Sequence, residues 1–240
     1  MTEDFTTSLP SEFDRMVIFD CDGVLAYQKG SWATIHEKFG TVDHQQEHLT
    51  QYRNGELDMI EWSERTVEHW AGRSAATLEA AASEATPISG FEETIATLKE
   101  LDFAVGVVSA GVLQYVEHIV GDAPVDFIIS NSIETADGEL TGEVQVDVID
   151  LNKIQWFKKL ANACEVPKEN VVLVGDAKND LVKIHSGNLS IAFNPQDEAV
   201  RDHADSVITD GDLRLILDPI REWLATTATP SKKKGNSVVD

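Results

Sequence analysis

Residues 16–24 read MVIFDCDGV, an apolar run that ends in two aspartates separated by one residue. A short, continuous apolar run is typical of a strand that is buried on both faces of a parallel sheet. The carboxyl end of such a strand opens onto the ligand crevice of an α/β sheet. There, Asp20 could act as a nucleophile while Asp22 protonates a leaving oxygen. Taken alone, the segment is equally compatible with an acidic strand end followed by an Asp-Gly turn.

Further apolar runs alternate with helix-like segments along the chain. The runs lie at residues 103–109, 126–130 and 171–176, and the helix-like segments lie at residues 91–101, 112–120, 151–164 and 213–224. A strand-helix-strand pattern also extends from about residue 179 to residue 209. This alternation predicts an α/β fold whose core is a Rossmann-like, doubly wound parallel sheet.

Two segments interrupt the alternation. Residues 25–88 have helical periodicity without a convincing strand, which predicts an inserted helical cap subdomain. Residues 133–146 alternate around Asp137-Gly138, which predicts a β-hairpin. The domain organisation that we expect is an α/β core of residues 1–24 and 89–228, a cap of residues 25–88, and a polar, disordered tail of residues 229–240.

The charge of the chain excludes several classes of partner. Lys and Arg number 19 against 42 Asp and Glu, for a net charge of -23 at pH 7. Such a field repels nucleic acid and anionic lipid surfaces. No stretch approaches the roughly 18 apolar residues of a membrane span, and the first residues lack a secretory pattern. Two widely separated cysteines, Cys21 and Cys164, favour reduced thiols in a cytoplasmic protein.

Three later segments place polar groups at the ends of predicted elements. Ser109 precedes Ala110-Gly111, so its hydroxyl and nearby backbone N–H groups could hold phosphate oxygens. Lys153, on a predicted helix, could neutralise a nucleophile and phosphoryl oxygens. Asp176 and Asp180 follow another strand, and acids at two strand ends can share one Mg²⁺ ion. Singly, these residues could equally be a helix cap, a solvated lysine and an acidic helix start.

Taken in order, the four segments resemble those of the haloacid dehalogenase superfamily of aspartyl-phosphate phosphotransferases. The resemblance extends from Met16 to about Thr209, and the helical insert is similar to the cap of that superfamily. Within it, the chain is most similar to the phosphoserine phosphatase-like family. That similarity rests on DGELTGEV at residues 137–144, GDAKNDL at 175–181 and GNLSIAFNP at 187–195.

The resemblance implies a role for each matched residue. Asp20 is expected to be the nucleophile and Asp22 the acid/base, with Ser109 and Lys153 as catalytic phosphate partners. Ala110 and Asn179 are expected to contact the phosphate region. The magnesium ligands implied are Asp20, Asp22, Asp176 and Asp180.

The insert departs from the pattern of the phosphoserine phosphatases. Those enzymes place a glutamate shortly after the first motif to meet the substrate ammonium, whereas this chain has Lys29 in that stretch. Their cap arginine, which takes the substrate carboxylate, falls at Thr66 here, with Arg65 one position away. One helix position rotates a side chain by about 100°. Lys29 and Arg65 are therefore candidate substrate-binding residues, and we expect phosphoserine not to be the preferred substrate.

Aromatic residues and histidines of the insert carry weaker signals. Trp32, Trp62 and Trp70 are expected to pack the insert, with Trp32 near the mouth of the pocket. His44 and His48 have the spacing of zinc ligands on a helix, but the sequence offers no third ligand. The pair is therefore interpreted as part of a solvated helix face.

The function expected from the sequence is a magnesium-dependent phosphomonoester hydrolase that acts on a small phosphorylated metabolite through an aspartyl phosphate. The alternatives are a genuine phosphoserine phosphatase of serine biosynthesis and a phosphomutase, which returns the phosphoryl group to its substrate. A non-enzymatic alternative is a phosphate-binding or phosphoreceiver module. Asp22 argues against the last, because an acid/base two residues away shortens the life of a phosphoaspartate.

The net charge of -23 predicts that the folded chain is stabilised by salt. At 1 M ionic strength the Debye length is about 3 Å, so repulsion between surface acids is largely screened. We interpret the surface as halophile-like and expect a higher melting temperature in molar KCl than in dilute buffer. A melting temperature that does not respond to salt would contradict this interpretation.

Overall fold

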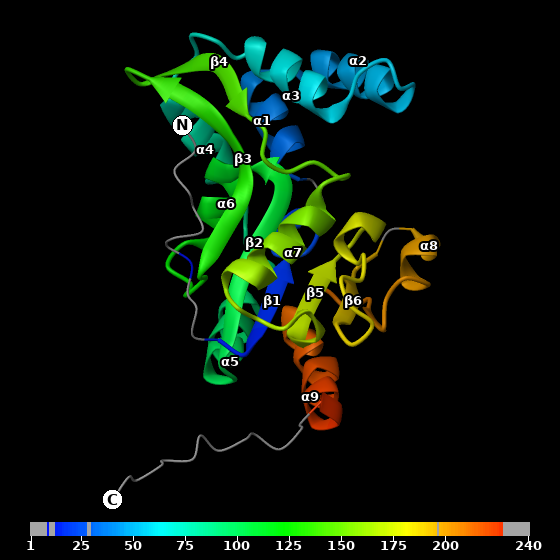
Figure 1. Cartoon of the computed structure of the whole chain (residues 1–240). Coiled ribbons are helices and arrows are strands. Elements are labelled where there is room, and N and C mark those ends of the chain that lie inside the picture. Colours follow the sequence, from blue (N-terminus) through cyan, green and yellow to red (C-terminus); the bar gives the residue numbers. More distant parts are fainter. Residues whose placement is uncertain (1–8, 10–12, 28–29, 196, 228–240) are drawn as a thin grey trace, which may run out of the picture.

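The computed structural model describes residues 9, 13–27, 30–195 and 197–227 (Figure 1). Its strands form one seven-stranded sheet in the order β4-β3-β2-β1-β5-β6-β7. They are β1 (Arg15–Phe19), β2 (Phe103–Val112), β3 (Phe127–Ala136), β4 (Glu139–Gln145), β5 (Val171–Gly175), β6 (Leu189–Phe193) and β7 (Ser206–Ile208). Every pair is parallel except β3 with β4. The sheet that the alternation predicts is therefore present.

Strand β1 lies at the centre of the sheet and is buried on both faces. Val17 and Phe19 point into one apolar cluster, and Met16 and Ile18 point into another on the opposite face. This division follows from the two-residue period of a strand. The first cluster receives residues of α5 (Phe91–Glu100), α6 (Leu113–Val120) and α9 (Leu217–Thr227), and the second receives residues of α7 (Lys153–Ala163). Helices on both faces make the sheet doubly wound, as expected.

The helical insert follows β1 and stands above the carboxyl ends of the strands (Figure 1). Its helices are α1 (Ser31–Phe39), α2 (Val42–Arg53), α3 (Met59–Glu68) and α4 (Ala75–Ala82). The rings of Trp32 and Trp62 meet edge-on at 5.0 Å, and Trp32 stacks on Trp70 at 6.1 Å. These tryptophans belong to the same buried cluster as β1 and β2. The insert and the sheet thus share one apolar core, while the exact boundary of residues 25–88 stays a prediction.

The β-hairpin ties the insert to the sheet at a second place. Strands β3 and β4 meet at Asp137-Gly138, where both residues have positive φ, as the sequence predicts. Near this turn, Gly72 N donates to Leu140 O at 2.8 Å. Leu140 N donates to Arg73 O at 2.8 Å, and Ala75 N donates to Gly138 O at 2.9 Å. These backbone hydrogen bonds hold α3 and α4 against the hairpin and so fix the insert over the strand ends.

The carboxyl-terminal part of the description completes the sheet and its cover. Short helix α8 (Glu198–Arg201) joins β6 to β7, and two 3₁₀ turns, η2 (Lys168–Asn170) and η3 (Lys178–Asp180), flank β5. The helix expected at residues 213–224 begins instead as a 3₁₀ turn, η4 (Leu213–Ile216), before α9. No helix of the described residues is long and apolar enough to cross a membrane. The expected disordered tail, residues 229–240, lies outside the described residues.

Four histidines lie close to one another in the insert. His69, which follows α3, stacks on His44 at 3.9 Å and on His48 at 5.4 Å. His48 is only 7% exposed, so the expectation of a solvated His44–His48 face is wrong for this side chain. His36 packs edge-on against Trp70 at 4.9 Å. Burial lowers the pKa of His36 to about 4, although hydrogen bonding to Thr41 opposes the shift.

The depressed pKa of His36 predicts that acid weakens the insert. An unfolded chain takes up a proton at His36 near pH 6.5, whereas the folded chain does so only near pH 4. The contribution of neutral, buried His36 to the free energy of unfolding is therefore fully present above pH 6.5 and is lost as the pH falls toward 4. His36→Gln should make the melting temperature less sensitive to pH between these values. Thermal unfolding with the same pH dependence in variant and parent would contradict this assignment.

Candidate active site

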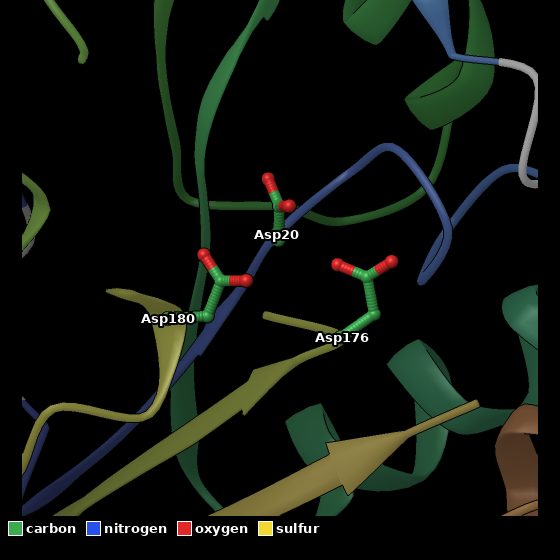
Figure 2. A group of neighbouring side chains, drawn as sticks. All are labelled: Asp20, Asp176 and Asp180. Carbon is green, nitrogen blue, oxygen red and sulfur yellow. The ribbon is translucent and has the colours of Figure 1, made fainter. Parts of the chain in front are cut away.

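Three aspartates converge at the carboxyl edge of the sheet. Asp20 follows β1, and its N–H donates to Val174 O at 3.0 Å, which prolongs the pairing with β5. Asp176 directly follows β5, and Asp180 ends the η3 turn. One carboxylate oxygen from each of Asp20, Asp176 and Asp180 lies within 4.8 Å of the others (Figure 2). Parallel strands thus bring together acids that are far apart in the sequence.

Gly175 makes the approach of Asp180 possible. A Cβ atom at position 175 would lie 2.0 Å from Asp180 Cβ, a distance that no side chain permits. The turn is closed by a hydrogen bond from Ala177 N to Asp180 Oδ2 at 3.1 Å. The glycine before Asp176 therefore lets the chain fold back, so that Asp180 returns to the end of β5.

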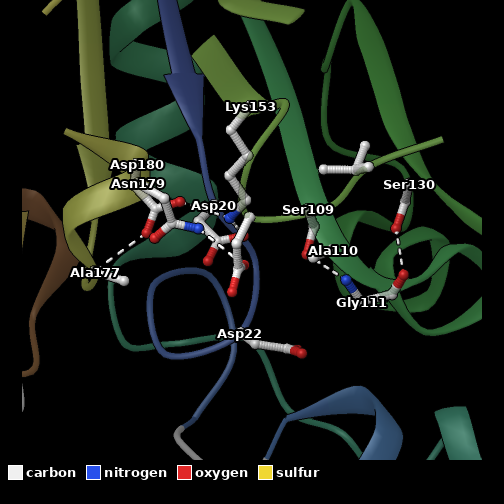
Figure 3. Close-up of polar contacts among 12 residues, drawn as sticks. Asp20, Asp22, Ser109, Ala110, Gly111, Ser130, Lys153, Ala177, Asn179 and Asp180 are labelled. Atoms are coloured by element: carbon white, nitrogen blue, oxygen red, sulfur yellow. Dashed lines mark hydrogen bonds and ion pairs between the residues drawn. The ribbon is translucent and has the colours of Figure 1, made fainter. Parts of the chain in front are cut away.

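Lys153, the first residue of α7, lies between two of these carboxylates (Figure 3). Its Nζ is 2.5 Å from Asp180 Oδ1 and 3.2 Å from Asp20 Oδ1, and its side chain is 3% exposed. Burial opposes the charge of Lys153, but attraction by Asp180 and Asp20 outweighs it and raises the pKa of the lysine. Burial also raises the pKa of Asp180 above its usual range, against the attraction of Lys153.

The three carboxylates fit a divalent cation. Lys153 can neutralise only one of them, and the buried Asp20 Oδ1 has only the ion pair with Lys153 at 3.2 Å to offset its charge among the described residues. Buried negative charge is costly unless it is paired or bound to a metal. An all-oxygen donor set of this kind suits Mg²⁺, which keeps several waters and binds few carboxylates. The carboxylate of Asp22, which the sequence also suggests as a ligand, does not belong to this group.

Asp22 is held apart from the three acids by the insert. Ser31, the first residue of α1, donates both its N–H and its hydroxyl to Asp22 Oδ2, each at 3.0 Å. Burial raises the pKa of Asp22 to about 6, and the charge of Asp20 adds to the shift, while the Ser31 hydrogen bonds oppose it. A carboxyl group with this pKa can be protonated near neutral pH, which is what a general acid requires.

Ser31 is a site residue that the sequence analysis missed. Its Oγ also accepts a hydrogen bond from Val112 N at 3.1 Å, so it joins the insert to the end of β2. A Cβ atom on Gly111 would lie 2.6 Å from Ser31 Oγ and 3.1 Å from Asp22 Oδ2. Gly111 is therefore required for this contact. A serine that begins a helix looks like an ordinary helix start, and its partners are distant in the sequence.

The segment after the predicted second strand presents Ser109. Strand β2 continues to Val112, beyond the expected end at residue 109. Ser109 Oγ accepts a hydrogen bond from Gly111 N at 3.1 Å, and Gly111 O accepts one from Ser130 Oγ at 2.9 Å (Figure 3). Ala110 O accepts hydrogen bonds from Trp32 Nε1 at 3.0 Å and from an asparagine side chain of β3 at 2.9 Å. These contacts fix the orientation of Ser109.

A cavity of about 280 Å³ connects these groups with the insert. Its lining residues are Asp20, Asp22, Trp32, Leu49, Tyr52, Met59, Trp62, Ser109, Ala110, Gly111, Asp150, Lys153, Ala177, Asn179 and Asp180. The structure thus gathers most of the predicted site residues around one cavity.

Among the described residues, Arg65 is the one predicted substrate-binding residue that does not line the cavity, and it is exposed on α3. Lys29 lies outside the described residues. Asn179 lines the cavity, and its Nδ2 donates to Asp150 Oδ1 at 2.9 Å. Asp150 is exposed, and no motif in the sequence identifies it. Only its place at the end of the segment that leads into α7 puts it beside the site.

The chain is similar in sequence to several known proteins. The sequence profile of the haloacid dehalogenase-like hydrolases matches residues 15–182. The phosphoserine phosphatase SerB2 of Mycobacterium tuberculosis is 32% identical over 197 residues, which cover 81% of this chain and 47% of the relative. The phosphoserine phosphatase of Methanocaldococcus jannaschii is 29% identical over 208 residues, covering 86% of this chain and 98% of the relative. Against the first three curated relatives, the chain spans about half of their length.

The chain is also similar to a solved structure. The phospho-aspartyl intermediate analogue of a phosphoserine phosphatase superposes with a TM-score of 0.73 at 28% identity. The superposition covers 87% of this chain and 99% of the other.

The contacts of Ser31 predict that it sets the proton affinity of Asp22. Removing the hydroxyl in Ser31→Ala removes a hydrogen bond to the charged carboxylate, so the pKa of Asp22 should rise from about 6. A hydrogen bond to a charged group corresponds to a shift of roughly one unit. Ser31→Thr, which keeps the hydroxyl, is the matched control. NMR titration of the Asp22 carboxyl carbon would measure all three proteins, and an unchanged pKa in Ser31→Ala would contradict the role of Ser31.

Proposed function

The chain belongs to the haloacid dehalogenase-like hydrolase family, and on this premise we propose that it hydrolyses small phosphate monoesters through an aspartyl phosphate on Asp20. The observation that carries the proposal is the position of Lys153 between Asp20 and Asp180, beside Asp176. The Asp20 carboxylate thus has a cation beside it and belongs to an acidic group that fits a metal ion. A nucleophilic aspartate needs both to approach a phosphate dianion.

The first step is attack by Asp20 on phosphorus. Repulsion between the carboxylate and the phosphate is roughly 4 kcal/mol per pair of unit charges at 4 Å and an effective dielectric constant of 20. The ammonium of Lys153 reduces this repulsion. Mg²⁺ held by Asp20, Asp176 and Asp180 would supply further positive charge to the phosphoryl oxygens. Ser109 Oγ accepts the Gly111 N–H, so its own hydrogen can still be donated to a phosphoryl oxygen.

Proton transfer in both steps falls to Asp22. With a pKa of about 6, a fraction of the protein holds Asp22 protonated near neutral pH. The protonated form gives its proton to the ester oxygen as the P–O bond breaks and the alcohol leaves. The resulting carboxylate then takes a proton from the water that attacks the phosphorus of the aspartyl phosphate. Inorganic phosphate leaves, and Asp20 is regenerated.

A second candidate substrate reaction is favoured by the names of the relatives. Curated relatives and solved neighbours of 28% identity or more are named as phosphoserine phosphatases. For this chain, hydrolysis of phosphoserine needs partners for an ammonium and for a carboxylate. The residues expected from the sequence at these positions are Lys29 and Thr66, which are the wrong types. We therefore place phosphoserine second, behind a monoester without those two charges.

The setting of the reaction is also part of the proposal. Cys21 and Cys164 are both free and buried. This state is compatible with a reducing cytoplasm, which is where we propose that the chain acts. The strongly negative surface gives no basis for a nucleic-acid partner.

Replacing the nucleophile tests the proposed function. Asp20→Asn should lower the release of phosphate from p-nitrophenyl phosphate in Mg²⁺ buffer by about a thousandfold or more, since the amide keeps the shape but cannot attack. Asp122→Asn, which removes an exposed carboxylate far from the site, should leave it unchanged. EDTA should abolish release by the parent protein.

Three results would contradict the proposal. Activity within tenfold of the parent in Asp20→Asn, in protein free of deamidation, would exclude the covalent route. Full activity in EDTA would exclude the metal. Accumulation of an isomeric phosphate ester from a sugar phosphate, in place of inorganic phosphate, would indicate a phosphomutase.

A further inference from the structure

The cavity has two chemically different ends. Its phosphoryl end is formed by charged and polar residues of the core, with Asp20, Asp22 and Lys153 at its centre. A second wall comes from the insert, through Trp32 of α1, Leu49 and Tyr52 of α2, and Met59 and Trp62 of α3. Every one of these five side chains is aromatic or apolar. The leaving group of a bound ester must lie against this wall.

No described lining residue is a cation that could pair with a carboxylate on the leaving group. Lys153 is the one basic side chain among the lining residues, and it is buried between Asp180 and Asp20 at 2.5 and 3.2 Å. Arg65, the candidate that the sequence suggests on the insert, is exposed and does not line the cavity. A carboxylate that loses its water without gaining a charged partner costs roughly tenfold to a hundredfold in affinity.

An ammonium group fares only slightly better. Asp150 is the one acidic lining residue away from the phosphoryl end, and it is exposed and already accepts a hydrogen bond from Asn179. Attraction between exposed charges is weak and is screened by salt. The described part of the lining therefore offers little to either charge of an amino acid.

The aromatic wall is rigid and already assembled. Trp32 and Trp62 are each less than 10% exposed and meet edge-on at 5.0 Å. Trp32 is fixed further by its hydrogen bond to Ala110 O at 3.0 Å and by stacking on Trp70. A wall held in this way binds a flat apolar group without losing side-chain freedom, and aromatic pairs add to the gain from buried area. The volume of about 280 Å³ is at the small end for ligand pockets, which suits one ring beside a phosphate.

We propose that the preferred substrates are phosphate monoesters whose leaving group carries one apolar, aromatic ring and no carboxylate. This inference rests on the proposed function, because it names the leaving group for the same hydrolysis. The core residues contact the phosphoryl group of any monoester. Selection among esters then falls to the five insert residues of the wall.

A panel of esters with similar leaving oxygens tests the inference. The leaving group of benzyl phosphate carries the ring, and that of O-phosphoserine carries an ammonium and a carboxylate. The leaving group of phosphoethanolamine has only the ammonium, and that of glycerol 3-phosphate is uncharged and polar. We expect kcat/KM for benzyl phosphate to exceed that for O-phosphoserine by at least about tenfold. This factor is the lower end of the range expected when one charged group loses its water without gaining a charged partner.

The outcomes distinguish failure of the proposed leaving-group preference from failure of the proposed hydrolysis. A higher kcat/KM for O-phosphoserine, or for glycerol 3-phosphate, than for benzyl phosphate would overturn the inference and leave the proposed function standing. Phosphoethanolamine in first place would overturn it in favour of Asp150 as the selecting group. No phosphate release from these esters or from p-nitrophenyl phosphate would overturn both.

A charge introduced into the wall gives a second test. Met59 is half-buried in the lining, so Met59→Lys should shift the ratio of kcat/KM for O-phosphoserine over benzyl phosphate upward by about tenfold or more. Ile60→Lys is the matched control, because Ile60 is the next residue of α3, is 41% exposed and does not line the cavity. Equal ratios in Met59→Lys and Ile60→Lys would show that this wall does not select the leaving group.

Discussion

The buried ammonium of Lys153 is the interaction on which the rest of the site depends. It lies between the carboxylates of Asp20 and Asp180, in a region where unpaired negative charge is costly. Gly175 makes this arrangement possible, because a side chain at position 175 would block the return of Asp180 to the strand end. Without the lysine, the acids would repel one another with no cation between them. With it, Asp20 has a cationic partner at the point where the cavity begins.

The insert acts on the chemistry as well as on access to it. Ser31 begins the first helix of the insert and holds Asp22 through two hydrogen bonds, while its hydroxyl also accepts a hydrogen bond from the end of β2. The proton affinity of Asp22, the proposed general acid, therefore depends on the position of the insert. The hairpin that pairs with Gly72 and Arg73, together with the shared apolar core, keeps this seat fixed. The wall that we propose for the leaving group is built on helices of the same insert, so the proposed proton transfer and substrate selection both depend on the insert.

Much of this could be predicted from the sequence, because local patterns determine it. The apolar runs predicted the strands in their order, the Asp137-Gly138 turn predicted the hairpin, and strand ends predicted the positions of Asp20 and Asp176. Ser109 was expected at a strand end but lies inside β2, which continues to Val112. The contacts of Ser31 and Asp150 could not be predicted, since their partners lie far away in the sequence and their residue types are ordinary. His69 was missed for the same reason, and with it the burial of His48. Position along a helix shows which face a residue occupies, but only packing shows what covers that face.

The central claim is that phosphate passes through a covalent bond to Asp20, and trapping that bond tests it most directly. Protein quenched during steady-state turnover of p-nitrophenyl phosphate and treated with borohydride would be digested and sequenced by mass spectrometry. Borohydride reduces an acyl phosphate to the alcohol and releases phosphate, so a phosphorylated aspartate becomes homoserine. The account predicts homoserine at position 20, in an amount that falls to background when substrate is omitted. Unmodified Asp20 in protein quenched during rapid turnover, or homoserine at Asp176 or Asp180 instead, would contradict it.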